Sequence, residues 1–221
     1  MKAAVIVFPG SNCDRAVAVS LRHAMGTDAD MVWHGDAEIP KTDLIVLPGG
    51  FSYGDYLRCG AMAAQSPIMK DVVAKANSGV PVLGICNGFQ LLTEAGLLPG
   101  VMLRNANLKY ICKDVHLRVE RNDTTFSRHY TQGDVIKIPI AHHDGNYFAD
   151  AQTLAQLEDQ NLIAFRYCDS EGQITDSANP NGSINNIAGI GLMPHPERLA
   201  DTQLGGSDGR PMFTSLVETL H

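Results

Sequence analysis

Residues 80–88, VPVLGICNG, are the stretch that decides the fold. The apolar run at 80–85 is typical of a buried strand, and a helix is expected directly after it at 87–95. Cys86 occupies the turn between strand and helix, with a glycine two positions away on either side. Glycines relieve the clashes of such a sharp turn, which presents its middle side chain at the carboxyl end of the sheet. The stretch therefore predicts a nucleophile elbow with cysteine in the nucleophilic position.

Strand and helix patterns alternate along the first half of the chain. The expected strands are residues 3–8, 29–34, 43–47 and 80–85, and the expected helices are 13–25, 67–77 and 87–95. Such alternation predicts a mostly parallel central sheet with helices on both faces. In the second half, strands are expected at 111–119, 134–140, 162–168 and 186–193, and a closing helix at 209–220. These strands predict a partly antiparallel extension of the sheet, within one α/β domain that spans residues 1–221.

The composition excludes several classes of protein. The chain has 221 residues, of which 44% are hydrophobic and 19% charged, and its formal net charge is -7. This balance is typical of a globular protein, and without a basic run a nucleic-acid partner is not expected. No apolar stretch approaches the ~18 residues of a membrane span, and the run at 3–8 is too short for a secretory signal.

The cysteines point to a reducing environment. The chain has 5 of them, widely spaced and without a Cys-x-x-Cys pair, which predicts neither disulfides nor a zinc site and favours the cytoplasm. Four lack the context of the elbow and are interpreted as small buried apolar residues: Cys13, Cys59, Cys112 and Cys168.

A thiolate nucleophile needs a partner that moves protons, and His195 is the strongest candidate. It lies in MPHPER, residues 193–198, between two prolines that favour an extended backbone. Residues two apart in an extended chain project to the same face, so the carboxylate of Glu197 would accept the second N–H of the imidazole. Cys86, His195 and Glu197 thus form a candidate catalytic triad. The alternative for this segment is a solvated surface turn.

His142 and His143 are the alternative bases. They lie in AHHDG, residues 141–145, where Asp144 follows them. A metal site is another interpretation of this cluster, although no third ligand stands at a recognisable spacing. We therefore expect a polar turn or a loop on the substrate side, and the role of the three residues stays open.

A glycine-rich segment, PGGFSYGD at residues 48–55, directly follows an expected strand. Glycines let backbone N–H groups approach a ligand closely. Together with the N–H of Asn87, such groups would stabilise the oxyanion of a tetrahedral intermediate. The alternative is an ordinary glycine turn. The sequence has no Gly-x-x-x-x-Gly-Lys-[Ser/Thr] phosphate loop.

These motifs together resemble those of the class I, triad-type glutamine amidotransferases. Three motifs carry the resemblance: PGG at 48–50, GICNGFQ at 84–90 and HPE at 195–197. Within that class the chain is similar to the small glutaminase subunits of phosphoribosylformylglycinamidine synthases. Four longer blocks support the closer similarity: FPGSNCDR at 8–15, GGFSYGDYLR at 49–58, LLTEAGLLPG at 91–100 and MPHPER at 193–198.

The resemblance implies a role for each matched residue. Cys86 would form a glutamyl thioester with the substrate L-glutamine, His195 would be the acid and base, and Glu197 would orient it. The oxyanion hole and substrate loop would comprise Gly49, Gly50, Phe51 and Asn87, and Gln90 would contact the substrate.

The resemblance also implies partners. A large synthetase subunit would bind ATP, magnesium and formylglycinamide ribonucleotide and use the ammonia. In many members of the family a small third subunit completes the complex. No cofactor and no metal are expected on this chain. Three departures from the family pattern are His143-Asp144, Ala16 and Cys59, none of them in the triad.

Three other functions compete with this interpretation. A peptidase or deglycase of the same broad fold typically has histidine after the elbow cysteine, whereas this chain has Asn87. A non-catalytic binding subunit would not need a complete triad. A glutaminase that serves another acceptor shares the triad and differs only in the longer blocks, especially GGFSYGD at 49–55.

Overall fold

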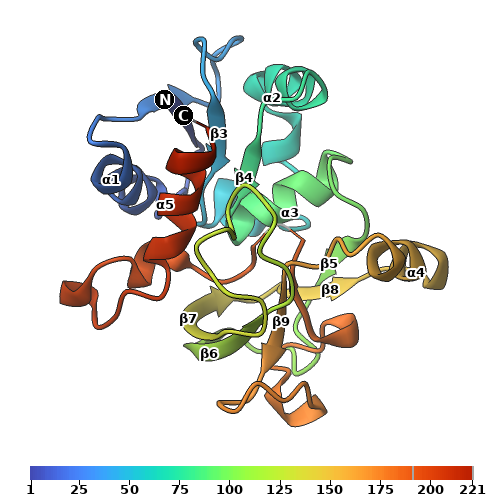
Figure 1. Ribbon diagram of the computed structural model, residues 1–221. Helices are drawn as coiled ribbons and strands as arrows, with labels where there is room; N and C mark the ends of the chain where they lie inside the picture. The colour runs from blue at the N-terminus through green and yellow to red at the C-terminus, as the bar shows by residue number, and fades with distance from the viewer. Residues whose placement is uncertain (191, 221) are drawn as a thin grey trace.

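The computed structural model describes residues 1–190 and 192–220 and contains two four-stranded sheets (Figure 1). The first sheet is wholly parallel and has the order β2-β1-β3-β4. Its strands are β1 (Ala3–Val7), β2 (Asp30–Trp33), β3 (Leu44–Leu47) and β4 (Val82–Gly84). The central strands are short and nearly all apolar because helices cover them on both faces.

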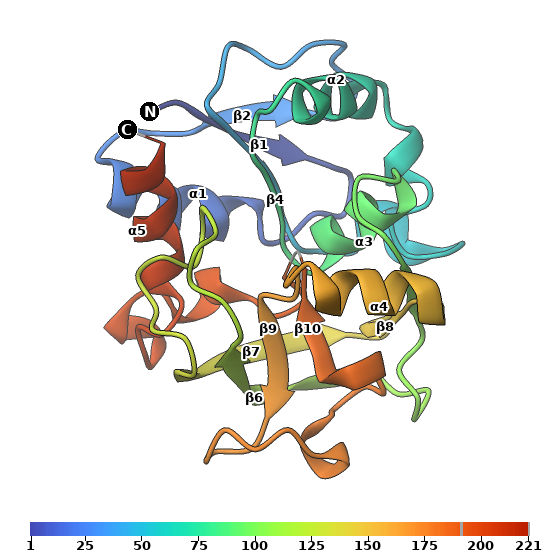
Figure 2. The ribbon, with the colours of Figure 1, turned by 45° about the vertical axis from the view of Figure 1, so that its right-hand side comes forward.

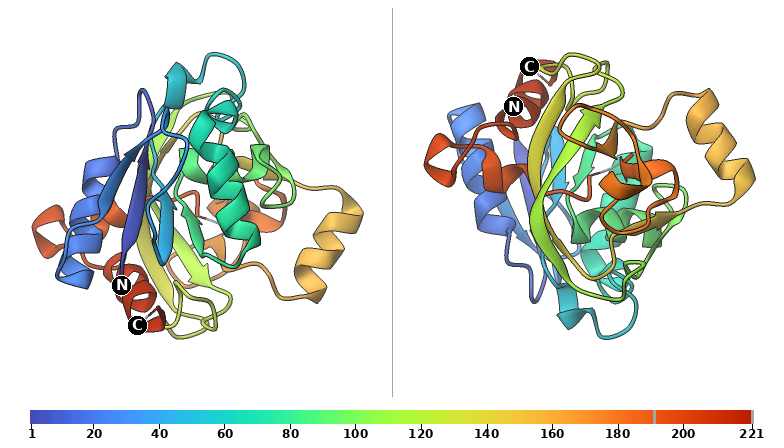
Figure 3. Two further views of the ribbon diagram at one scale, coloured as in Figure 1. Left: turned by 90° about the horizontal axis from the view of Figure 1, so that it is seen from above. Right: turned by 90° about the horizontal axis from the view of Figure 1, so that it is seen from below.

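Alternate residues of β1 point to opposite helix layers. Val5 packs in one apolar cluster with side chains of α1 (Asp14–Met25) and α5 (Arg210–Thr219). Ile6 packs in a second cluster with side chains of α2 (Pro67–Asn77). Figure 3 shows α1 and α2 on opposite sides of the sheet. The predicted three-layer α/β arrangement is therefore confirmed.

The second sheet is antiparallel and has the order β10-β9-β6-β7. It lies below the parallel sheet in Figure 2. Its strands are β6 (Ile111–Val119), β7 (Val135–His142), β9 (Phe165–Cys168) and β10 (Ile187–Gly189). An isolated parallel bridge between Ile85 and Leu192 joins the two sheets. This sheet is the predicted antiparallel extension, attached at the carboxyl end of β4.

Three short elements were not predicted from the sequence. They are β5 (Val101–Leu103), β8 (Asn146–Phe148), which pairs with it, and α4 (Ala151–Asp159). The strand expected at 186–193 is shorter than predicted, since β10 ends at Gly189, and Gly191 lies outside the described residues. None of the helices in the described part of the chain combines the length and apolar character that a membrane span requires.

Candidate active site

The elbow at Cys86 is formed by an unusual backbone conformation. Cys86 has φ 49° and ψ -106°, a region that a residue with a side chain occupies only when its surroundings hold it there. Its N–H donates to the carbonyl of Leu192 at 2.7 Å, and α3 (Asn87–Glu94) begins at the next residue. A Cβ added to Gly88 would lie 1.9 Å from the carbonyl oxygen of Leu47. Only glycine lets the helix start this close to β3.

His195 and Glu197 contact each other directly. The Nδ1 of His195 lies 2.7 Å from Oε1 of Glu197, and both residues are buried. The extended backbone expected here is wrong, because Pro196–Leu199 is a turn of 3-10 helix that begins directly after His195. The N–H of His195 donates to the carbonyl of Pro139 in β7 at 2.9 Å. The antiparallel sheet thus holds the imidazole at the end of the parallel sheet.

Gly49 lies between the imidazole and the elbow. A Cβ at this position would be 2.6 Å from Cε1 of His195 and 3.3 Å from Cβ of Cys86. The thiol and the imidazole therefore share one confined space, which glycine alone leaves open. Among the described residues, Nε2 of His195 has no hydrogen-bond partner although it is buried. This nitrogen is therefore free to exchange a proton.

The electrostatics of the site favour the protonated imidazole. Burial lowers the pKa of His195, but the neighbouring sulfur of Cys86 and carboxylate of Glu197 raise it by more, so that the pKa lies well above its ordinary value. The cause is the attraction between an imidazolium and two groups that carry negative charge when ionised. A cationic His195 in turn stabilises a thiolate next to it.

The glycine-rich loop brings backbone donors beside the elbow. Gly50 has φ +147°, and a Cβ there would lie 2.8 Å from the backbone nitrogen of Asn12. The N–H of Phe51 is already used, because it donates to Gly10 at 3.1 Å. The N–H groups of Gly50 and Asn87 make no hydrogen bond to the residues that the structure describes. These two are the donors available for an oxyanion.

Side chains around Asn87 and Gln90 form a polar cluster beneath this loop. The amide of Gln90 is occupied at both ends, since it accepts from Asn87 at 2.7 Å and donates to the carbonyl of Asp144 at 2.6 Å. The thiol of Cys59 donates to the Asp144 carboxylate at 3.0 Å. Burial raises the pKa of the nearby Asp55 to about 6. Sequence reasoning did not single out Asp55, although it belongs to the quoted GGFSYGD block.

The alternative bases are placed differently from His195. His142 is buried, and its Nδ1 lies 3.1 Å from the side-chain oxygen of Asn105. Burial lowers the pKa of His142 to about 4, which keeps its imidazole neutral. His143 is exposed. Within the described chain, His142, His143 and Asp144 do not bring ligand atoms together in a metal-binding group.

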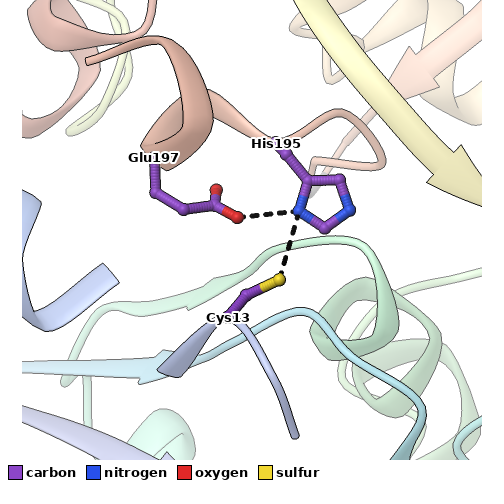
Figure 4. A group of neighbouring side chains, drawn as sticks. All are labelled: Cys13, His195 and Glu197. Atoms are coloured by element: carbon purple, nitrogen blue, oxygen red, sulfur yellow. Dashed lines mark hydrogen bonds and ion pairs between the residues drawn. The ribbon is translucent and has the colours of Figure 1, made fainter. Parts of the chain in front are cut away.

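A second thiol approaches the imidazole at Nδ1. The sulfur of Cys13 lies 3.8 Å from Nδ1 of His195 and accepts a hydrogen bond from Arg198 at 3.0 Å. Figure 4 shows Cys13 and Glu197 both directed at the same ring nitrogen. Sequence reasoning treated Cys13 as an apolar residue. One sequence feature could have drawn attention to Cys13: it lies in the FPGSNCDR block, directly after an expected strand.

A model of the CobB/CobQ-like glutamine amidotransferase domain matches residues 1–205. Together with the elbow and the contact between imidazole and carboxylate, this match defines the class as glutamine amidotransferase. The phosphoribosylformylglycinamidine synthase subunit PurQ of Rhodopseudomonas palustris (strain HaA2) is 56% identical over 229 aligned positions, which cover 100% of this chain and 98% of the relative. The PurQ subunit of Ruegeria sp. (strain TM1040) is 58% identical over 225 positions, or 98% of this chain and 97% of the relative.

The structure of PurLQS from Thermotoga maritima contains a chain with the same fold. It matches with a TM-score of 0.84 and 40% identity, over 100% of this chain and 99% of that one. The chain described here belongs to the PurQ family of glutamine amidotransferases. The expected resemblance is therefore confirmed at the level of both class and family.

Proposed function

We propose that the chain is the glutaminase subunit of a phosphoribosylformylglycinamidine synthase. It hydrolyses L-glutamine to glutamate and ammonia. A large partner subunit then uses the ammonia for the ATP-dependent conversion of formylglycinamide ribonucleotide to formylglycinamidine ribonucleotide, a step of de novo purine biosynthesis. Identities of 53–58% to PurQ subunits over nearly their whole length support this assignment.

The first half of the reaction forms a thioester. The thiolate of Cys86 attacks the side-chain carbonyl carbon of glutamine, and the N–H groups of Gly50 and Asn87 stabilise the resulting oxyanion. His195 donates a proton from Nε2 to the departing nitrogen, which leaves as ammonia. Glu197 keeps its hydrogen bond to Nδ1 and so fixes the orientation of the ring.

The second half releases glutamate. A water molecule attacks the thioester carbonyl while Nε2 of His195 takes one of its protons. The tetrahedral intermediate collapses, the carbon–sulfur bond breaks, and the thiolate of Cys86 is restored. The observation that carries this proposal is the placement of the strained Cys86 and the His195–Glu197 pair on either side of Gly49.

Chemical labelling tests the assignment of the nucleophile. A diazo-ketone analogue of glutamine should modify Cys86 first among the five cysteines, as mapped by mass spectrometry of peptides. Cys112 is an internal control, because it is exposed and lacks the elbow. Loss of activity with modification at Cys59 or Cys112 instead would place the nucleophile elsewhere.

The acceptor chemistry belongs to partners in this proposal. The chain carries no phosphate loop, so ATP and magnesium would bind the large subunit, with a small third subunit completing a cytoplasmic complex. Free glutaminase activity would waste glutamine, so we expect the partner to set the oxyanion loop at 49–55. Correct placement of one oxyanion donor is worth about 2.7 kcal/mol, which corresponds to a ~100-fold higher glutaminase rate in the complex. Equal rates with and without the large subunit would contradict this coupling.

A further inference from the structure

The surroundings of Nδ1 of His195 have the features of a metal site. Ligand atoms of Cys13, His195 and Glu197 all lie within 4.8 Å of one another. The three side chains are buried, and they offer one sulfur, one nitrogen and one oxygen. Figure 4 shows Cys13 and Glu197 converging on Nδ1 of His195. The mechanism uses only two of these three groups.

The spacing of the ligand atoms suits zinc. A tetrahedral zinc ion with bonds of ~2.3 Å to sulfur and ~2.0 Å to nitrogen holds these two atoms about 3.6 Å apart. The observed separation between the Cys13 sulfur and Nδ1 is 3.8 Å. Nδ1 and the Glu197 oxygen, now 2.7 Å apart, would separate by roughly 0.6 Å when a metal replaces their shared proton. Rotation of the carboxylate supplies a shift of this size.

One of the three groups adjoins a cavity. A cavity of about 830 Å³ lies between α1 and α5, and Glu197 forms part of its wall. One oxygen of this carboxylate, Oε2, has no hydrogen-bond partner among the described residues. Arg198 donates to the Cys13 sulfur, but its side chain is 38% exposed and can swing into solvent.

We propose that Cys13, His195 and Glu197 form an inhibitory zinc site that is entered from the cavity between α1 and α5. On binding, zinc takes the lone pair of Nδ1 after the imidazolium has released its Nδ1 proton to water, while Nε2 keeps its hydrogen, and the thiol of Cys13 also releases its proton to water. Nε2 then carries a hydrogen and can no longer accept one. The inhibition, though not the metal site itself, rests on the proposed role of His195 as the base.

Cobalt is the probe that tests the site directly. The full-length Cys86→Ala chain removes the catalytic thiol, and Co²⁺ replaces zinc with a sulfur-to-metal charge-transfer band in the near ultraviolet. We expect one equivalent of Co²⁺ to produce this band and Zn²⁺ to displace it. The band should disappear with Cys13→Ser, which keeps the size of the side chain, and persist with Cys112→Ser, a matched control at an exposed thiol. A band that survives Cys13→Ser, or no band at all, would overturn the proposal.

Kinetics separate the zinc site from the proposed function. Micromolar Zn²⁺ should inhibit glutamine hydrolysis in the complex, a chelator should restore it, and saturating glutamine should not relieve it. Each rate is expressed as a fraction of the rate of the same variant without zinc. On this scale, Cys13→Ser should raise the half-inhibitory Zn²⁺ concentration at least tenfold. Inhibition that glutamine relieves and that Cys13→Ser leaves unchanged would assign the metal to Cys86 and reject the site. A cobalt band in the Cys86→Ala chain, together with a wild-type complex that shows no glutaminase activity, would instead reject the proposed function alone.

Discussion

The two sides of the active site are positioned by different means. Cys86 is placed by its immediate neighbours in the sequence, since β4 ends and α3 begins within a few residues of it. His195 is placed by a distant segment, through its N–H to Pro139 in β7, and its imidazole is oriented by Glu197, two residues further along the chain. The proposed nucleophile can therefore be recognised from one short stretch, whereas the position of the proposed base depends on the assembled antiparallel sheet.

The largest effect is expected on stability, at Gly88, where the start of α3 packs against β3. Gly88→Ala would place a methyl group 1.9 Å from the Leu47 carbonyl oxygen, which a buried backbone cannot accommodate. We expect the free energy of unfolding to fall by about 3 kcal/mol or more in urea titrations. Gly96→Ala is the control, because nothing lies within 4 Å of its added Cβ and only its φ of +70° is strained, at a cost of about 1 kcal/mol. Equal losses in the two variants would disprove the close contact.

Substitutions of His195 and Glu197 should lower the activity rather than the stability of the fold. His195→Asn removes the group that transfers protons, so glutamate release in the complex should fall by ~10³-fold or more. Glu197→Gln keeps the imidazole and weakens only its orientation, and a rate lower by on the order of 10²-fold should remain measurable. Near wild-type rates in both variants would point to His142 or His143 as the base.

Gly49 tests how tightly the two sides must fit together. Gly49→Ala would place its methyl 2.6 Å from Cε1 of His195 and so displace the imidazole from Cys86. A displacement of this kind should lower the glutaminase rate roughly 10- to 100-fold while the chain stays folded. Gly79→Ala, a position with no atom within 4 Å of the added Cβ, should leave the rate unchanged. A Gly49→Ala enzyme as fast as the Gly79→Ala control would show that the two sides tolerate more separation.

The smallest effect concerns pH. Because burial raises the pKa of Asp55 to about 6, the folded state holds a proton that the unfolded chain has lost by then. The stability contributed by this proton is present below about pH 4 and lost as the pH rises through about 6. The urea midpoint of unfolding of the wild type, minus that of Asp55→Asn, should therefore decrease between about pH 4 and about pH 6. A difference that stays constant, or rises, would contradict the assigned burial of the carboxyl group.

The parallel half of the fold was predictable because its signals are local. The helix expected at 67–77 matches α2, and the strand expected at 43–47 matches β3 except for its first residue. β5 and β8 were missed because each has three residues and is stabilised only by pairing across a long stretch of chain. α4 had a local signal that was overlooked: Asp150 caps it by accepting a hydrogen bond from the backbone of Thr153.

The candidate site divides in the same way. The motifs predicted Cys86, His195 and Glu197 as the site, and the structure brings His195 and Glu197 into contact, although the extended backbone used to relate these two was wrong. Cys13 could not be placed beside His195 from the sequence, because α1 and the segment that carries His195 meet only in the folded chain. Its contact with Arg198 likewise depends on tertiary packing rather than on any spacing.

The most direct test of the central claim uses the Cys86→Ala chain assembled with its large subunit. We expect this complex to make no product from glutamine, because the thioester cannot form. Ammonium salt should restore product formation, since ammonia enters after the step that needs the thiolate and the synthetase half is unchanged. Failure of ammonium to rescue a properly assembled complex would contradict ammonia transfer, and with it the account of Cys86, His195 and Glu197 as a glutaminase site.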